Sequence, residues 1–299
     1  MRCKNILQTI GNTPLVLIKE SKDKKYRLWA KVESFNPSGS IKARVANYII
    51  EEAIKSKLVN KRTIIIEATS GNTGIGLAMV CAVKKLKLIV TMPNNMSQER
   101  IDILKAYGAK VILTDMSQGM EGAKNKAIEL CSVFKNSFMP SQFTNINNSL
   151  IHYLTTGKEI LDDLGEIDCL VAGIGTSGTI MGISKYLKEK KDVHIVGVEP
   201  FSSPLLSKGK IGIHKIQGIG ANFIPPLLNK KYLDEIMLVK DKSAIIYTKK
   251  LVKENGLFVG LSSGAVYKAA LDIYNNKKFH DIVAVFPDDG QKYLSLKIW

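Results

Sequence analysis

The sequence predicts an α/β protein whose parallel sheets are covered by helices on both faces. Short β-branched runs alternate with longer segments of helical period through most of the chain, which is typical of that fold class. Two glycine-rich polar loops also stand directly between an expected strand and an expected helix. The length of 299 residues suits one large α/β unit or two compact domains, and a hydrophobic fraction of 45% is ordinary for a protein with a substantial core.

The expected strands are six short runs rich in valine and isoleucine. The clearest expected helix follows residue 40, where Ile41, Val45 and Ile49 recur at every fourth position. The periodicity breaks at residues 140–148, a stretch rich in asparagine, so a seam between domains is expected there. The six expected strands are residues 63–66, 87–92, 110–113, 169–172, 194–198 and 282–286.

The composition argues against several classes of protein. The four cysteines and four histidines are too scattered for a metal site built by the protein. The first residues contain no long apolar run, so we expect neither a secretory signal nor a membrane span. The expected location is the cytoplasm. The net charge of +16 is spread along the chain without interleaved aromatic residues, so we interpret it as solvated helix faces. We therefore expect no nucleic-acid partner and no membrane partner.

A first polar loop, residues 69–74, reads Thr-Ser-Gly-Asn-Thr-Gly and lies between the strand 63–66 and an apolar helix. Such a loop presents backbone N–H groups at the positive end of a helix, which suits an anion such as a carboxylate. An ordinary N-capped turn is the alternative, because Ser, Thr and Asn are good caps. A cap needs only one such residue and this loop has four, so we favour a binding role.

A second loop, residues 173–179, reads Gly-Ile-Gly-Thr-Ser-Gly-Thr and follows the expected strand 169–172. It fits the G-x-G-x-x-G pattern of dinucleotide-binding folds, and Glu199 ends the next strand where such folds place a ribose-binding acid. Three hydroxyl groups in the loop instead favour a terminal phosphate, held by side chains and amides on several sides. The pattern by itself leaves both alternatives open.

A third segment, residues 36–44, places Lys42 on the first turn of the expected helix. Helix lysines usually lie on the solvated face, but Ile41 and Val45 mark an apolar stripe directly beside this one. Partial burial and the positive end of the helix both disfavour the ammonium form of a lysine. A neutral amine is what a Schiff-base lysine requires, so Lys42 is the candidate nucleophile.

Together these segments resemble the cysteine synthase family, the fold-type II pyridoxal-phosphate enzymes that also include cystathionine β-synthase. The resemblance runs nearly from end to end of the chain and decides against the dinucleotide alternative. Further matching blocks are residues 10–15, 31–33, 92–93, 96–97, 142–143, 152, 155–157, 217–220, 260–264, 289–290 and 293–295.

The resemblance implies a fold of the tryptophan synthase β type, with two parallel-sheet α/β domains and the cofactor, pyridoxal 5′-phosphate, between them. The smaller domain would comprise residues 37–145 and carry the substrate loop. The larger domain would comprise residues 1–36 and 146–299 and carry the phosphate loop. A homodimer is expected by analogy with the family.

The resemblance also implies roles for individual residues. Lys42 would hold the cofactor as a Schiff base and move the Cα proton as acid or base. Asn72 would bond the ring hydroxyl, and Ser262 would face the ring nitrogen, with Ser263 as the less favoured neighbour. The cofactor phosphate would be held by Gly175, Thr176, Ser177, Gly178 and Thr179. The substrate would be bound by Thr69, Ser70, Gly71, Thr73, Gln142, Gly220 and Asn222.

A neutral hydroxyl at the ring nitrogen would leave the pyridine unprotonated, which favours β-elimination over transamination. The implied activity is β-replacement through an aminoacrylate, as in a cysteine synthase that converts O-acetylserine and sulfide to cysteine and acetate. The alternative is an enzyme that consumes cysteine, releases hydrogen sulfide and forms serine, lanthionine or cystathionine. An NAD-dependent dehydrogenase and a catalytically silent binding protein are alternatives from other classes.

Two positions depart from the family pattern. Ala43 follows the lysine where the family usually has Asp, and Asn222 replaces the second glycine of Gly-Ala-Gly-Phe-Ile-Pro. Asn222 would place an amide near the substrate, where it could order a water molecule or a second amino acid, or simply be tolerated. The choice among O-acetylserine, phosphoserine and cysteine as the first substrate stays open.

Overall fold

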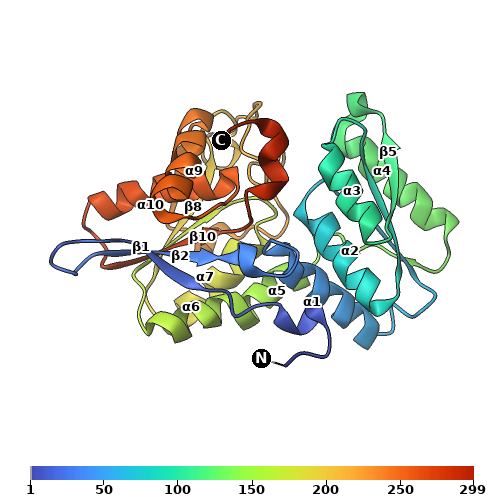
Figure 1. The fold of residues 1–299 in the computed structure, drawn as a ribbon, viewed down its shortest axis with the longest axis horizontal. Helices are drawn as coiled ribbons and strands as arrows, with labels where there is room; N and C mark the ends of the chain where they lie inside the picture. Colours follow the sequence, from blue (N-terminus) through green and yellow to red (C-terminus); the bar gives the residue numbers. More distant parts are fainter. Residues whose placement is uncertain (1) are drawn as a thin grey trace. The chain divides into compact units, whose positions relative to one another are not determined.

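The computed structural model describes residues 2–299 and divides them into two compact units (Figure 1). Unit 1 comprises residues 2–10 and Asn36–Asn147, and unit 2 comprises Gly11–Phe35 and Asn148–Trp299. The sequence-based boundaries assigned residues 1–36 to the larger domain, but residues 2–10 belong to unit 1, and Met1 lies outside the described residues. The reason is that Leu7 and Ile10 pack against the core of unit 1.

Within the described residues, unit 1 contains a four-stranded parallel sheet in the order β5-β4-β3-β6. Alternate side chains of β3 face opposite sides, so Ile65 packs toward α1 and α2 whereas Ile66 packs toward α4. The elements are η1 (Ile6–Thr9), α1 (Lys42–Lys55), β3 (Ile64–Ala68), α2 (Asn72–Lys84), β4 (Lys87–Pro93), α3 (Gln98–Ala106), β5 (Lys110–Thr114), η3 (Met116–Gln118), α4 (Gly119–Val133) and β6 (Ser137–Phe138).

The sheet of unit 2 has six strands among the described residues, in the order β1-β2-β10-β7-β8-β9. All neighbours are parallel except β1, which pairs with β2 as an antiparallel edge hairpin. Helices α9 and α10 cover one face of this sheet, and α6 and α7 cover the other (Figure 1).

The strands of unit 2 are β1 (Leu15–Glu20), β2 (Arg27–Val32), β7 (Cys169–Gly173), β8 (His194–Pro200), β9 (Glu235–Val239) and β10 (Asp281–Phe286). Its helices are η2 (Glu33–Phe35), the π-helical η4 (His152–Thr156), α6 (Gly157–Leu164), α7 (Gly178–Lys190), α8 (Leu205–Lys208), η5 (Lys230–Tyr232), α9 (Asp241–Asn255), α10 (Leu261–Asn275) and η6 (Gln291–Leu296). The short α5 (Asn147–Ile151) begins at the boundary between the units.

The α/β fold class and all six expected strands are confirmed, each strand with its bounds shifted by no more than two residues. The sequence missed β1, β2, β6 and β9. β1 lies at the edge of the sheet and is partly exposed, and β2 carries the charged Arg27 and Lys31 among its apolar residues. β6 has only two residues.

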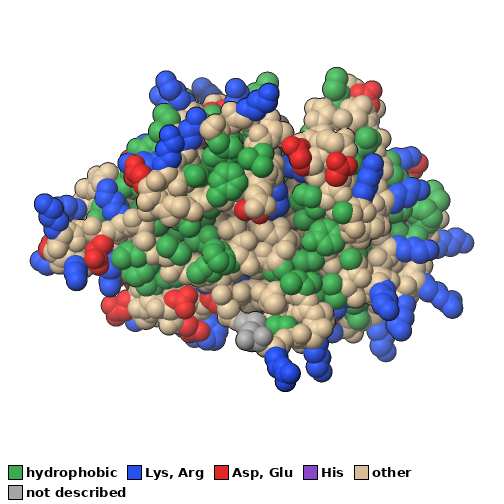
Figure 2. Space-filling model, viewed as in Figure 1, with side chains coloured by type: hydrophobic (Ala, Val, Ile, Leu, Met, Phe, Trp, Pro, Cys, Tyr) green, Lys and Arg blue, Asp and Glu red, His purple; other side chains and the backbone are tan. Residues whose placement is uncertain are grey.

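Lysine and arginine side chains are spread over the face shown in Figure 2, with acidic side chains between them. Several lysines of the chain pair with an acid three or four residues away on their own helix, such as Lys126 with Glu129 at 2.6 Å. This distribution agrees with solvated helix faces as the source of the net charge. In the part of the chain that the structure describes, no helix combines the length and the apolar character needed to cross a lipid bilayer.

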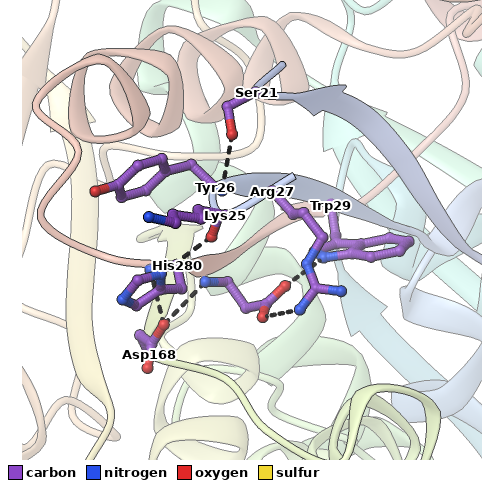
Figure 3. A network of polar contacts seen from close by, with 8 residues as sticks. Ser21, Lys25, Tyr26, Arg27, Trp29, Asp168 and His280 are labelled. Atoms are coloured by element: carbon purple, nitrogen blue, oxygen red, sulfur yellow. Dashed lines mark hydrogen bonds and ion pairs between the residues drawn. The ribbon is translucent and has the colours of Figure 1, made fainter. Parts of the chain in front are cut away.

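A polar network ties the β1–β2 hairpin to the centre of the sheet (Figure 3). Asp281, at the start of β10, accepts hydrogen bonds from Trp29 Nε1 at 2.9 Å and from Arg27 Nη2 at 2.5 Å. Asp168 accepts the backbone N–H groups of His280 and Asp281, and the His280 ring stacks on Tyr26. These contacts hold the β1–β2 hairpin against β10. The strand of the hairpin that pairs with β10 is β2, which contains the buried Lys31.

We expect Asp281→Asn to destabilise the protein by about 2 kcal/mol. The substitution removes a buried carboxylate that accepts one hydrogen bond from the Arg27 guanidinium and one from the Trp29 indole. Denaturant unfolding would measure the change. Asp192→Asn, at an exposed position before β8, is the matched control and should stay within about 0.5 kcal/mol of the wild type. Equal effects of the two substitutions would contradict a stabilising role for the network.

Candidate active site

The loop after β3 leads directly into the first turn of α2. The helix begins at Asn72 with Gly71 as its N-cap, and no described side chain caps it. Thr69 and Thr73 are buried, whereas Ser70 is half-buried. The alternative of an ordinary turn capped by its N-cap side chain has no support, because the N-cap is a glycine. The start of α2 is thus compatible with an anion site.

Gln142 lies beside this loop in unit 1. The Thr73 hydroxyl donates a hydrogen bond of 2.6 Å to Gln142 Oε1, and both side chains are buried. The contact joins two of the residues expected to bind a substrate carboxylate, although they are 69 positions apart in the sequence. The reason is topological, because β3 and β6 are adjacent parallel strands and the segments that follow them leave the sheet at the same edge.

Glu67 supports the segment that carries Gln142, and the sequence analysis missed it. Its carboxylate accepts the backbone N–H groups of Ser141 at 2.9 Å and of Gln142 at 3.2 Å. Burial raises the pKa of Glu67 from 4.5 to about 7, against the opposing effect of the two amide hydrogen bonds. The only sequence signal was an acidic residue inside the apolar strand Ile-Ile-Ile-Glu-Ala.

Lys42 is the first residue of α1, as predicted, and its side chain is half-buried. The turn before the helix is closed by the Gly39 N–H bond to the Asn36 carbonyl at 2.7 Å, with Gly39 at a positive φ of 67°. Helix α2 passes so close that a Cβ on Gly76 would lie 2.9 Å from the Lys42 carbonyl oxygen. A glycine at position 76 thus fixes how closely α2 packs against the backbone of Lys42.

The glycine-rich loop of residues 173–179, which the sequence predicts to hold a phosphate, follows β7 in unit 2. Helix α7 starts at Gly178, with Ser177 as an N-cap in the left-handed region at φ 69° and no capping bond from any described side chain. A Cβ on Gly175 would lie 2.3 Å from the Gly218 carbonyl, and one on Gly178 would lie 2.1 Å from Asn148 Oδ1. These two glycines are therefore required by close packing of the loop against its neighbours.

Two side chains that the sequence analysis did not assign hold the hydroxyl groups of this loop. Asn148 Nδ2 donates to Thr176 Oγ1 at 3.0 Å, and His152 Nε2 lies 3.2 Å from Thr179 Oγ1. The other ring nitrogen of His152 lies 2.9 Å from Thr156 Oγ1. His152 stands at the start of the π-helical η4, and such segments often occur at functional sites.

The loop fits a phosphate group. The Ser177 hydroxyl is buried and has no hydrogen-bond partner among residues 2–299, so a bound phosphate oxygen would satisfy it. The N–H groups at the start of α7, which no described side chain caps, and the hydroxyls of Thr176 and Thr179 offer further donors in the same loop.

The remaining residues of unit 2 that the sequence predicts for the site are Gly220, Asn222 and Ser262. The segment before Asn222 packs along the loop, because the Gly220 N–H donates to the Ile174 carbonyl at 2.9 Å. Ser262 is buried on the first turn of α10. Its Oγ lies next to Gly218, at 3.9 Å from the position that a Cβ on this glycine would take. Gly220 has a positive φ of 71°, whereas Asn222 is exposed.

The dinucleotide alternative has no support in the geometry of unit 2. Both carboxylate oxygens of Glu199 are engaged, since they accept the N–H groups of Leu206 and Ser207 at 3.0 and 2.9 Å. The acid that would bind a ribose therefore caps α8 instead. Over residues 2–299, no three His, Cys, Asp or Glu side chains come together in a way that could hold a metal ion.

Comparisons with known proteins agree on one family. The family model described as pyridoxal-phosphate dependent enzyme matches residues 6–288. Cysteine synthase B of Campylobacter jejuni is 49% identical over 99% of this chain and 98% of that protein. A hydrogen sulfide-producing enzyme of Fusobacterium nucleatum has a TM-score of 0.93 and 46% identity, over 98% of this chain and 100% of the other. The O-acetylserine-dependent cystathionine β-synthase of Helicobacter pylori has a TM-score of 0.93 and 39% identity, over 99% and 98%.

The chain belongs to the family of pyridoxal-phosphate dependent enzymes. It is an enzyme of fold-type II whose cofactor is pyridoxal 5′-phosphate, and it is similar to cysteine synthases over nearly its whole length. The sequence-based predictions of family, fold and cofactor are thus confirmed, and an NAD-dependent dehydrogenase is the wrong alternative.

The raised pKa of Glu67 predicts a pH-dependent contribution to stability. The folded protein binds this proton more tightly than the unfolded chain, so the contribution is complete below about pH 4.5 and is lost as the pH rises toward 7. We expect the unfolding free energy of the wild type to fall by about 2–3 kcal/mol relative to Glu67→Gln between pH 4.5 and 8. Urea unfolding across this range measures the difference, and parallel profiles for the two proteins would contradict it.

Proposed function

We propose that this enzyme catalyses β-replacement on a serine-type amino acid, and specifically that it acts as a cysteine synthase converting O-acetylserine and sulfide to cysteine and acetate. The observation that carries the proposal is the hydroxyl-rich start of α2, which no described side chain caps and which suits a substrate carboxylate. The 49% identity to a cysteine synthase over nearly the whole chain supports it. When bound, pyridoxal phosphate supplies the electron sink that allows the Cα proton to leave.

The residues of unit 1 hold the substrate and move its proton. Lys42 would hold the cofactor covalently and would serve as the acid or base at the substrate Cα. Asn72, the first residue of α2, would hydrogen-bond the ring hydroxyl. The substrate carboxylate accepts hydrogen bonds from the loop residues Thr69, Ser70, Gly71 and Thr73. The side-chain amide of Gln142 is a further donor to it.

The residues of unit 2 hold the cofactor phosphate and set the electronic character of the ring. Gly175, Thr176, Ser177, Gly178 and Thr179 bind the phosphate through amides and hydroxyls. Ser262 offers a neutral hydroxyl to the ring nitrogen, which leaves the ring a weaker electron sink than an aspartate partner would. A weaker sink favours departure of a β-leaving group over transamination. Gly220 lies on the segment that leads to Asn222 and packs against the phosphate loop.

A second candidate is an enzyme that starts from cysteine and releases hydrogen sulfide. The exposed Asn222 favours it, because an amide can orient a water molecule or a second amino acid toward the β-carbon. The 46% identity to a hydrogen sulfide-producing enzyme also supports it. Both candidates share the chemistry at Cα and differ in the leaving group and the nucleophile.

The proposal extends to the setting of the enzyme, a cytoplasmic homodimer that takes a small amino acid and a thiol or sulfide. The support for this part is the resemblance to the family. Size-exclusion chromatography with light scattering decides the oligomeric state, and a monomer at working concentration would rule out the dimer.

Lys42→Ala should lower the rate of cysteine formation from O-acetylserine and sulfide at least about 100-fold, because it removes the acid–base group. The variant should stay folded, since the buried side of α1 is kept. Lys55→Ala on the same helix is the matched control, with an exposed side chain that pairs only weakly with Glu52. Near-native turnover of the Lys42 variant would refute the assignment, and turnover of cysteine alone by the wild type would favour the second candidate.

Asn222→Gly should shift the ratio of products toward sulfide addition by at least about threefold, because it removes an amide able to hydrogen-bond water or a second amino acid. The rates to compare are those with sulfide, cysteine, homocysteine and no added thiol. Asn276→Gly, at an exposed helix end, is the control for a general effect of the substitution. Equal ratios in the wild type and the Asn222 variant would show that the amide is passive.

A further inference from the structure

Glu67 is an acidic residue buried within an otherwise apolar strand. It is only 3% exposed, between Ile66 and Ala68 of β3. A carboxylate taken out of water costs several kcal/mol unless other groups compensate its charge. No lysine or arginine of the described chain forms an ion pair with it, and its two oxygens instead accept the N–H groups of Ser141 and Gln142. The backbone N–H groups of residues 141–142 therefore compensate part of the cost of burying this carboxylate.

The position of Glu67 places it between two segments of the proposed substrate site. It precedes the loop of Thr69 by two residues at the carboxyl end of β3. The neighbouring strand β6 pairs in parallel with β3, through Ile64 with Ser137 and Ile65 with Phe138. The chain after β6 thus leaves the sheet next to the loop after β3, and the carboxylate spans the two.

The backbone at Ser141 has an unusual conformation that this carboxylate explains. Ser141 has a positive φ of 53°, a region that residues other than glycine rarely adopt. The successive N–H groups of Ser141 and Gln142 donate to the two oxygens of one carboxylate, Oε2 and Oε1 of Glu67, much as consecutive amides bind an anion in backbone nests. The two bonds are charge-assisted when Glu67 is ionised and so are stronger than neutral ones.

The side chain of Gln142 is fixed from the other end. Its Oε1 accepts the Thr73 hydroxyl at 2.6 Å, so the amide presents its N–H groups for its other contacts. The backbone of Gln142 is thus held by Glu67 and its side chain by Thr73. An amide held at both ends keeps its donors in one direction, as recognition of a carboxylate requires.

We propose that Glu67 is a positioning residue for amino-acid binding, which acts by holding the amides of Ser141 and Gln142 and thereby orients the Gln142 side chain. This inference rests on the proposed role of Gln142 at the substrate carboxylate. Glu67 contacts neither substrate nor cofactor in this scheme. Its effect is on the affinity for the amino acid rather than on the chemical step.

The first test compares the steady-state kinetics of the wild-type and Glu67→Gln holoenzymes. We expect KM for the amino-acid substrate to rise roughly tenfold, as for the loss of a charge-assisted hydrogen bond, with kcat within about threefold of the wild type. Cofactor content, measured by visible absorbance, should not change. Glu121→Gln, an exposed acid of the same unit, is the matched control. A KM within twofold of the wild type, or an equal loss in kcat, would overturn the proposal.

The second test asks whether Glu67 acts through Gln142. In a double-mutant cycle, Glu67→Gln should change KM by less than about twofold once Gln142→Ala is present, because the group being oriented is gone. A purely structural role would leave the full effect in that background and so overturn the proposal. Glu67→Asp keeps the charge but shortens the side chain by one methylene group, so it should also raise KM. This variant replaces Glu67→Gln in the test if the glutamine variant does not fold.

Hydrogen exchange separates this inference from the proposed function. The amides of Ser141 and Gln142 should exchange faster in Glu67→Gln than in the wild type, while amides in the centre of β4 should not change. Unaltered protection at residues 141–142 would overturn the positioning role whatever the enzyme's substrate is. A wild-type enzyme that turns over no serine- or cysteine-type amino acid would instead refute the proposed function, even with the exchange result as expected.

Discussion

The starts of α2 and α7 impose the constraint on which the two candidate binding loops depend, one loop in each unit. A helix leaves its first N–H groups without partners, and no described side chain caps either of these helices. Each helix follows the carboxyl end of a parallel strand, β3 in unit 1 and β7 in unit 2, so its first turn lies at an edge where loops meet. Anionic groups satisfy such amides best, and both a carboxylate and a phosphate are anionic. The hydroxyl-rich sequences of the two loops then add donors at the same points.

Close backbone packing keeps these donors in place. Gly76 allows α2 to lie against the backbone of Lys42, and Gly178 allows α7 to approach the side chain of Asn148. Any larger residue at either position would have to displace its neighbour, because a Cβ would lie at 2.9 Å or less from it. The glycines of both motifs therefore serve packing as well as the approach of a ligand. Of the two, Gly178 also stands out in the sequence as a loop glycine, whereas Gly76 lies within α2.

The sequence predicted the parts of the molecule that follow a local pattern. Periodicity identified the six strands and the helix of Lys42, and the two loops could be placed because each separates a strand from a helix. The edge strand β1 and the two-residue β6 have no such pattern and were missed. Glu67, Asn148 and His152 were also left without a role, because each acts through a contact with a residue far from it in the sequence or in an irregular segment. Long-range partners of this kind follow from the topology, which local periodicity does not specify.

The two departures from the family pattern differ in physical character. Ala43 is fully buried in the core of unit 1, where it packs with apolar neighbours such as Ala46 and Ile50. An aspartate there would bring a carboxylate into an apolar cluster, so alanine fits the packing of this chain without any need for a catalytic explanation. Asn222 is exposed, and packing does not require it. A polar side chain that contributes nothing to the core is free to be selected for what it binds, which makes Asn222, rather than Ala43, the position where this enzyme's choice of nucleophile should be sought.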